Sequence, residues 1–175
     1  MSRITKFSRN NVAQSACVLQ ISAVREPPSA KPGPHALITP DQIQLVRASF
    51  AKVLPIKAKA AAIFYDRLFQ VAPHVRGMFP DDVTVQGAKL MSAIGFVVAG
   101  LERLESIIPQ VQELGRKHVG YGVQEEHYAM VGDCLIWTLE LGLGPAFTPK
   151  VREAWIEAYG MLAEAMIAAA HMRAA

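Results

Sequence analysis

The sequence predicts an all-α protein. Apolar residues recur at intervals of three and four along most of residues 39–170, the spacing that places them on one face of a helix. Proline and glycine clusters separate these segments, and no alternating apolar and polar run bounded by turn residues indicates a strand. We therefore expect six substantial helices and one short helical turn, without an internal repeat.

Size and charge favour one domain that follows a short basic extension. The 175 residues are 51% hydrophobic, which is enough for one sizeable core. Residues 1–38 carry five basic side chains against Glu26 alone, a net charge of +4; the whole chain has a net charge of +3, so residues 39–175 carry about −1. The domain lacks the basic character of nucleic-acid-binding proteins, and no nucleic-acid partner is expected.

Residues 1–38 are predicted to be a flexible N-terminal extension, and residues 39–175 the domain. The first 25 residues contain no acidic side chain, but polar residues interrupt their apolar part, which makes a poor targeting signal. The proline cluster between Pro27 and Pro34 is typical of a linker.

The two cysteines, Cys17 and Cys134, make neither a disulfide framework nor a zinc site. This fits a reducing compartment, and we expect a cytoplasmic location. The longest charge-free apolar run, Leu90–Leu101, is too short to span a bilayer and is typical of a buried helix.

The first and last predicted helices begin with the same signal. Thr39 is a capping residue, Pro40 fits the first helical position, and Gln42 completes a capping box. Thr148-Pro149 repeats the cap and the proline before the last helix, which extends to about Ala170. The apolar face of the first helix is formed by Ile43, Val46, Phe50 and Val53.

Four further helices are predicted between these two. Pro55 ends the first helix, and a short turn over residues 73–78 leads to Phe79. The helix that ends near His118 is entered through Ser106 and Pro109. The approximate ranges of the four helices are 56–70, 83–103, 106–118 and 124–141, with a break at 142–145.

His118 projects from the apolar face of its predicted helix. Leu114 lies four residues and Val111 seven residues before it, so the three side chains share one face. Gly120 and Gly122 follow at once, which places the imidazole near the C-terminal end of the helix. Alone, this position also suits a hydrogen-bonded core histidine.

The residues that accompany His118 resemble those of the globins. Phe79 looks like the phenylalanine that wedges the haem in nearly every globin, and His118 looks like the proximal ligand of the haem iron. The stretches that resemble neuroglobin are Leu114–His118 with Gly122-Val123, and Leu143–Pro149 followed by Arg152, Ala154-Trp155 and Tyr159-Gly160. The resemblance runs from about Thr39 to Met166. It implies a globin fold, with 3-on-3 helical packing around haem b.

The opposite side of the expected site differs from neuroglobin. Alignment without a gap from His118 back to Lys89 puts Gln86 at the position of neuroglobin's distal histidine. Leu90 lies one turn later, and Tyr65 falls at the distal position of the second helix. Tyr65, Gln86 and Leu90 resemble the distal pocket of flavohaemoglobins and their single-domain relatives. Lys89 resembles the lysine that reaches a haem propionate.

Hydroxyl and amide donors at these positions would favour O₂. Bound O₂ carries partial negative charge, and a hydrogen bond to a charged group contributes about 1.5–3 kcal/mol. Two such bonds correspond to roughly 10²–10⁴-fold tighter binding than in an apolar pocket. Leu90 would restrict the room beside the ligand. Slow O₂ release follows, which suits chemistry or sensing better than delivery.

One feature of flavohaemoglobins is only partly present. Tyr128, ten residues after His118, matches the tyrosine that supports their proximal histidine, but the position of the supporting glutamate falls at Ala170. We therefore expect weaker electron donation from His118 to iron. The sequence has no Gly-x-Gly-x-x-Gly segment for a dinucleotide, so NO dioxygenation would need a separate reductase.

Each of these residues also has an ordinary structural interpretation. Tyr65 and Phe79 suit a core, and Gln86 and Lys89 suit a solvent-exposed helix surface. Their joint occurrence with His118 in globin order favours the functional interpretation. The histidines not assigned to the site are His35, His74, His127 and His171.

Three functions are consistent with this pattern. The leading one is a haem-b protein that reversibly binds O₂, NO and CO at a five-coordinate iron, with proximal His118 and distal Tyr65 and Gln86. The second is an NO dioxygenase that depends on a separate reductase, with Tyr65 and Gln86 as its catalytic residues. The third is a signalling module that keeps the globin fold but has lost haem; the residues on both sides of the site argue against it.

Overall fold

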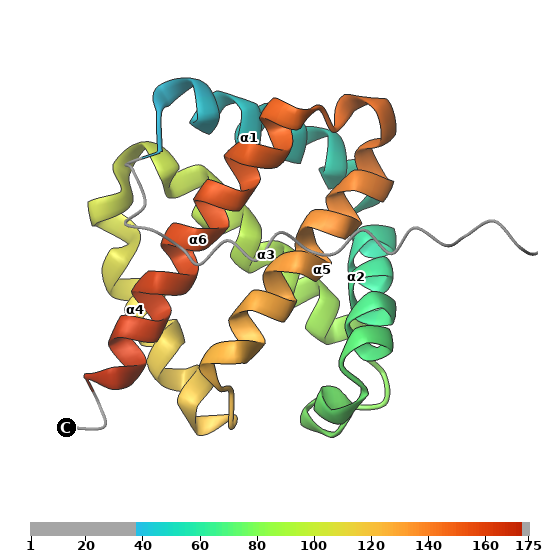
Figure 1. Ribbon diagram of the computed structural model, residues 1–175, viewed down its shortest axis with the longest axis vertical. Coiled ribbons are helices and arrows are strands. Elements are labelled where there is room, and N and C mark those ends of the chain that lie inside the picture. The colour runs from blue at the N-terminus through green and yellow to red at the C-terminus, as the bar shows by residue number, and fades with distance from the viewer. Residues whose placement is uncertain (1–37, 173–175) are drawn as a thin grey trace, which may run out of the picture. The chain divides into compact units, whose positions relative to one another are not determined.

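The structure is a computed structural model that describes residues 38–172 (Figure 1). Its α-helices are α1 (Pro40–Val53), α2 (Lys57–Val71), α3 (Thr84–Gly100), α4 (Leu104–Gly120), α5 (Glu125–Leu143) and α6 (Pro149–His171). Short 3₁₀ helices connect them: η1 (Leu54–Ile56), η2 (Pro73–Met78), η3 (Leu101–Arg103) and η4 (Gly144–Ala146). No strand occurs within residues 38–172, and the all-α prediction is confirmed. The predicted extension lies outside the described residues except for Ile38, which is buried in the core.

The six α-helices pack together in one compact unit. In Figure 1, α5 and α6 lie in front, α3 passes behind them, and α2 and α4 stand on opposite sides. The single turn η3 joins α3 directly to α4. Taken as one stretch, Thr84–Gly120 is long and apolar enough to cross a membrane, but core helices of globular proteins meet the same two criteria. Here η3 divides the stretch, and many of its apolar side chains line the cavity described below.

The predicted helix starts at Thr39 and Thr148 are confirmed. The hydroxyl of Thr39 accepts a hydrogen bond from the backbone N–H of Gln42 at 3.2 Å, and the Gln42 side chain accepts from the N–H of Thr39 at 2.8 Å. The hydroxyl of Thr148 accepts from the N–H of Val151 at 3.4 Å. These contacts satisfy backbone donors that have no partner inside the helix.

Two other predicted helix ends are wrong. α4 begins at Leu104, and Pro109 lies inside it, where the missing N–H removes one backbone hydrogen bond. α5 continues through Gly142 to Leu143, whose side chain is buried, and ends at Gly144 with a φ of +52°. Burial of a leucine contributes about 1.5–3 kcal/mol, which exceeds the roughly 1 kcal/mol cost of a helical glycine. The extra turn is therefore favourable.

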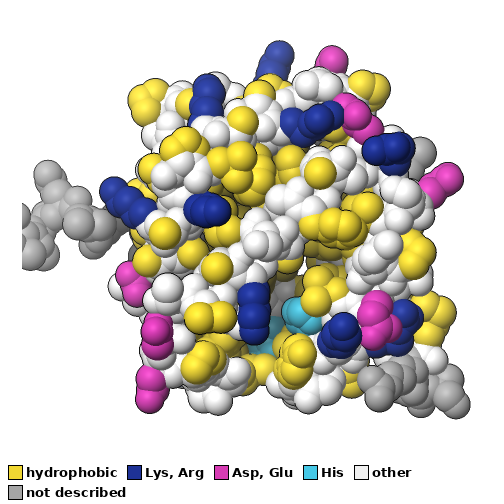
Figure 2. Space-filling view, turned by 180° about the vertical axis from the view of Figure 1, so that it is seen from behind, with side chains coloured by type: hydrophobic (Ala, Val, Ile, Leu, Met, Phe, Trp, Pro, Cys, Tyr) yellow, Lys and Arg dark blue, Asp and Glu magenta, His cyan; other side chains and the backbone are white. Residues whose placement is uncertain are grey.

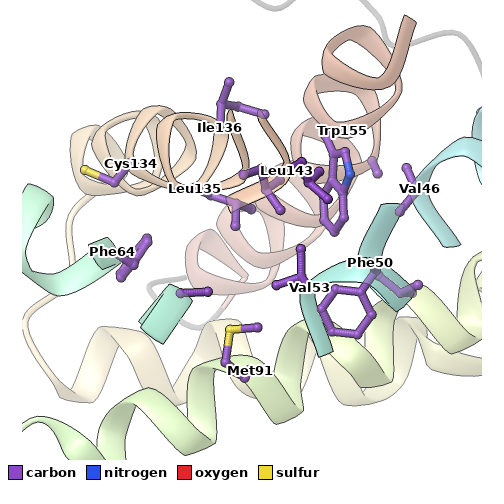
Figure 3. Close-up of a cluster of buried hydrophobic side chains, with 14 of the residues drawn as sticks. Val46, Phe50, Val53, Phe64, Met91, Cys134, Leu135, Ile136, Leu143 and Trp155 are labelled. Atoms are coloured by element: carbon purple, nitrogen blue, oxygen red, sulfur yellow. The ribbon is translucent and has the colours of Figure 1, made fainter. Parts of the chain in front are cut away.

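The main core lies between α1, α2, α5 and α6, with part of α3 below them (Figure 3). Trp155 of α6 is buried, and its indole N–H donates to the hydroxyl of Ser49 on α1 at 2.9 Å. Ser49 in turn donates to the carbonyl of Leu45 at 2.7 Å, so both buried polar groups are hydrogen-bonded. The ring of Phe50 packs on Trp155 with centroids 6.2 Å apart. These contacts hold α6 against α1.

α4 and α6 cross at very close range. A Cβ added to Gly115 would lie 2.8 Å from the Cα of Met166, which means that the two backbones touch at this point. Only glycine permits such an approach. Gly115 lies three residues before His118, so the contact ties the position of His118 to the core helix α6.

Candidate functional site

A cavity of about 430 Å³ extends inward between α3 and α4. Its walls come from all six α-helices and from η2 and η3, and they are mostly apolar. Figure 2 shows its opening as a hollow with histidine side chains inside and basic side chains nearby. The residues that the sequence predicted for the site all line this cavity: Tyr65, Phe79, Gln86, Lys89, Leu90, His118 and Tyr128.

His118 presents one ring nitrogen to the cavity side. Its Nδ1 lies 2.8 Å from the carbonyl oxygen of Leu114. Because a carbonyl can only accept, Nδ1 must carry the proton, and in the neutral ring Nε2 then has a lone pair. Burial lowers the pKa of His118 and favours this neutral form. The geometry is that of an imidazole prepared to coordinate a metal through Nε2.

Tyr128 lies beside His118 and is itself held by Tyr159. The rings of His118 and Tyr128 are stacked, with centroids 6.2 Å apart and an interplanar angle of 28°. The hydroxyl of Tyr159 donates to the backbone carbonyl of Tyr128 at 2.6 Å. A Cβ on Gly132 would lie 2.6 Å from the Tyr159 ring, so this glycine makes room for the ring. α5 and α6 thereby support the orientation of the histidine.

Tyr65 and Gln86 meet on the other side of the cavity. Tyr65 is buried, and burial raises its pKa to about 12, although a hydrogen bond with the Gln86 side chain lowers the value in part. The phenol and the amide can each donate and accept, so either group can turn a hydrogen toward a ligand in the cavity.

An aromatic cluster surrounds the Tyr65 ring. Phe79 lies edge to face with Tyr65 at 5.5 Å between centroids, and Phe69 lies 5.8 Å from Tyr65 and 5.6 Å from Phe79. Such tilted and edge-to-face pairs are the favoured arrangements of aromatic rings. The cluster fixes the direction in which the Tyr65 hydroxyl points.

Arg76 is a further residue of the site that the sequence did not indicate. Its guanidinium donates to the carbonyls of Phe79, Pro80 and Asp81 at 3.1, 3.0 and 3.1 Å. It also lies 4.7 Å from the centroid of the Phe69 ring, which is within cation–π range. Arg76 lies in η2, does not line the cavity itself, and holds the segment that carries Phe79.

Lys89 and Leu90 follow Gln86 on α3 and take different positions. Leu90 is half-buried and lies one helical turn after Gln86, so the two side chains face the cavity together. Lys89 is exposed at the rim, where a charged head can reach a bound acidic group. Both residues line the cavity, and their roles remain predictions.

His127 also lines the cavity, although the sequence did not assign it there. Its Nδ1 accepts from the backbone N–H of Gln124 at 3.1 Å, as part of the start of α5. In the neutral ring, Nε2 then carries the proton and offers no lone pair to a metal. His74 of η2 lies beside it, with centroids 6.0 Å apart. His118 is thus better suited to coordination than His127.

The residues of the cavity fit a haem. Within residues 38–172, no three His, Cys, Asp or Glu side chains come together to hold a bare metal ion. A metal bound by His118 would need a group that brings further ligands of its own, as a porphyrin does. The apolar walls suit a porphyrin ring, and the exposed Lys89 at the rim suits its acidic propionates.

Comparisons with known proteins agree with this geometry. Residues 62–166 match the family profile described as Globin. A flavohemoprotein of Bacillus subtilis (strain 168) is 37% identical over 107 residues, which are 59% of this chain and 27% of that protein. Neuroglobin of Tetraodon nigroviridis is 28% identical over 137 residues, which are 70% of this chain and 86% of that protein. The chain therefore spans about a quarter of the length of the flavohemoprotein.

A solved structure shares the fold over most of its length. It is that of a proposed nitric oxide dioxygenase from Rhodothermus marinus, engineered as a carbene transferase. It superposes with a TM-score of 0.70 at 27% sequence identity, over 77% of this chain and 94% of that chain.

Proposed function

Because this chain belongs to the globin family, we propose that its cavity holds haem b and that the protein reversibly binds O₂, NO and CO there. His118 would hold the iron from one side, and Tyr65 and Gln86 would face the ligand on the other. One observation carries the proposal. The Nδ1 proton of His118 is engaged by the Leu114 carbonyl, which leaves Nε2 as a ligand in a cavity that these side chains share.

Haem, when bound, supplies an iron with an open coordination position for a diatomic gas. Phe79 would pack against the porphyrin, Leu90 would restrict the space beside the ligand, and Lys89 would pair with a propionate at the rim. Tyr128 stacks on His118 and keeps its ring oriented.

Tyr65 supports slow release of O₂. Because its pKa is raised to about 12, the hydroxyl is protonated at neutral pH and remains a donor. The Gln86 amide would donate to the same oxygen, which would leave the hydroxyl hydrogen for the ligand. One hydrogen bond to a ligand with partial negative charge contributes about 1.5–3 kcal/mol, which slows release roughly 10- to 150-fold.

An absorbance spectrum of the full chain tests the proposal. After addition of haemin and reduction, we expect a sharp Soret band that shifts when CO is added. A spectrum identical to that of free haemin would contradict haem binding and would favour the haem-free signalling module.

NO dioxygenation is the second proposed function, favoured by the similarity to the flavohemoprotein and to the Rhodothermus marinus protein. In this reaction NO and O₂ combine with one electron to give nitrate. The electron would come from a reductase outside these 175 residues, since the sequence has no dinucleotide-binding glycine motif. Tyr65 and Gln86 would hold O₂ while NO reacts.

Repeated turnover separates this reaction from simple gas binding. With NADH and a flavin reductase, nitrate should form in large excess over protein, and catalase and superoxide dismutase should not change its yield. One equivalent of nitrate and no more would leave gas binding as the function, because a single conversion is expected of any O₂-carrying globin.

A further inference from the structure

A second apolar depression lies on the outer surface between α3 and α4. This groove has a volume of about 460 Å³, and its walls are mostly apolar. Phe96 on α3 and Pro109 on α4 line it, and so do the exposed side chains of Gln110, Glu113 and Lys117 on α4. Phe96 is 47% exposed, an unusual degree for a phenylalanine.

The floor of the groove is also a wall of the central cavity. Ala93, Val97 and Leu114 line both spaces, so one layer of side chains separates them. Val97 and Leu104 pack against both of the protein's apolar clusters, which meet at this position. Val97 is half-buried, and no polar side chain shares the floor with it.

The three shared residues continue the two faces of the proposed haem site. Ala93 lies seven residues after Gln86, and Val97 lies seven after Leu90, so both extend the distal face of α3 by two turns. Leu114 lies one turn before His118 on α4. The groove thus meets the cavity where the distal helix α3 faces the proximal helix α4, and Ala93 lies one turn after Lys89 on α3.

From this arrangement we infer that the α3–α4 groove is an entrance for small apolar gases, closed by the side chains of Val97 and Leu114. The inference rests on the proposed gas-binding function. O₂, NO and CO are small and apolar, and an apolar passage one side chain thick admits them while it excludes ions. Rotamer changes of partly exposed side chains occur within picoseconds to nanoseconds, so they open the passage without movement of the helices.

A bound haem would occupy the part of the cavity that opens at the rim near Lys89. Gases would then have two routes to the ligand position, past the rim and through the groove. The groove reaches the cavity at Ala93, Val97 and Leu114, whose side chains are all aliphatic.

Gln110→Trp is the cleanest variant, because Gln110 lines the groove but not the cavity. The indole would fill the groove from outside. Val97→Ala removes part of the floor, and Gln70→Trp is the matched control at an exposed position on α2 outside both spaces. Rates of CO and O₂ association and dissociation are measured on the haem-loaded full chain by flash photolysis and stopped flow.

A passage controls entrance and escape alike. We therefore expect Gln110→Trp to slow association and dissociation by the same factor, threefold or more, with unchanged affinity. Val97→Ala should accelerate both rates, and Gln70→Trp should change neither. Xenon-pressurised crystals provide a readout independent of the iron: xenon is expected beside Val97 in the wild type and absent in Gln110→Trp.

The results separate this inference from the proposed function. A normal haem spectrum with unchanged rates in both Gln110→Trp and Val97→Ala would overturn the entrance alone. So would a change in affinity without a change in association rate, because that result indicates an altered ligand site instead of an altered path. A wild type that takes up no haem would overturn both.

Discussion

Gly87 on α3 and Ala61 on α2 meet so closely that a Cβ on Gly87 would lie 2.8 Å from the Cβ of Ala61. Ala61 lies one helical turn before Tyr65, and Gln86 directly precedes Gly87. The contact therefore sets the distance between the two helices at the point where the Tyr65 hydroxyl meets the Gln86 amide.

Gly87→Ala should disturb the distal site without removing any of its polar groups. The added methyl overlaps Ala61 and forces α2 and α3 apart, which weakens the hydrogen bond between Gln86 and Tyr65. We expect O₂ release to accelerate about threefold, and stability to fall by about 1–3 kcal/mol, partly offset by the roughly 1 kcal/mol higher helix propensity of alanine. The double variant Gly87→Ala/Ala61→Gly should restore both properties. Stopped-flow kinetics measure the rate of O₂ release, and urea unfolding measures the stability. If Gly87→Ala is indistinguishable from the wild type in both, α2 and α3 can accommodate the added methyl group without moving apart.

His118→Ala should abolish stable haem binding. The replacement removes the side chain whose Nε2 is available for coordination, and His127 has its Nδ1 lone pair engaged by the start of α5. The expected result is loss of the ferrous–CO Soret band, with recovery when imidazole is added. His127→Ala is the control and should retain the band. A normal band in His118→Ala without imidazole would remove His118 from its proposed role.

Tyr65→Phe should accelerate O₂ release by about tenfold or more, which corresponds to roughly 1.4 kcal/mol. The variant keeps the ring that packs on Phe79 and loses only the donor. CO carries less charge when bound, so its release should change less. Because an amide is a poor iron ligand, Gln86 should leave the ligand-free ferrous iron five-coordinate, with one broad visible band. Unchanged O₂ release, or the sharp split bands of a six-coordinate ferrous iron, would show that the distal side is assigned incorrectly.

Stability of the haem-free protein should decline at alkaline pH. Burial raises the pKa of Cys134 from 9.0 to about 11 and that of Tyr65 from 10.0 to about 12. Both groups therefore ionise at a lower pH in the unfolded chain than in the folded protein. The stabilisation is complete below about pH 9 and is lost as the pH rises toward 12, because only the unfolded state releases protons in that window. Urea midpoints between pH 7 and 11 measure the decline, and in Cys134→Ala it should begin about one pH unit later. A midpoint that rises over this range would contradict the assignment.

Removal of residues 1–36 should leave the domain intact. The N-terminal segment is rich in proline and poor in aromatic residues, and such segments bury little apolar surface. A chain that begins at Leu37 keeps Ile38, which packs in the core. Its thermal midpoint and haem content should equal those of the full chain. A midpoint several degrees lower would show that the removed segment packs on the domain.

The parts of the fold that depend on local chemistry were predictable from the sequence. The capping residues Thr39 and Thr148 act on backbone groups within three residues, so their effect can be inferred without the rest of the chain. The helix ends predicted at Pro109 and Gly142 are wrong, because contacts made elsewhere in the structure outweigh the local preference of these two residues. The turn η3 leads straight into α4, and the burial of Leu143 extends α5 by a turn.

The same distinction applies to the site. Helical spacing was enough to predict that the side chains of Tyr65, Gln86 and His118 lie on the inner faces of their helices. In the structure all three line one cavity. Arg76 and His127 escaped prediction for a physical reason. Arg76 acts on backbone carbonyls, which every residue has, and His127 reaches the cavity only because α5 starts beside η2.

The three carbonyls that accept from Arg76 have a consequence for how this chain can vary. Backbone oxygens look alike whatever side chain follows them, so Pro80 and Asp81 can be exchanged for other residues while the hydrogen bonds persist. The Asp81 carboxylate is fully exposed and only 3.5 Å from the guanidinium, and such a pair adds little. Arg76 has no such freedom, since a lysine offers no planar fork of donors. Among related proteins, we therefore expect the residues after Phe79 to vary and the arginine at position 76 to be retained.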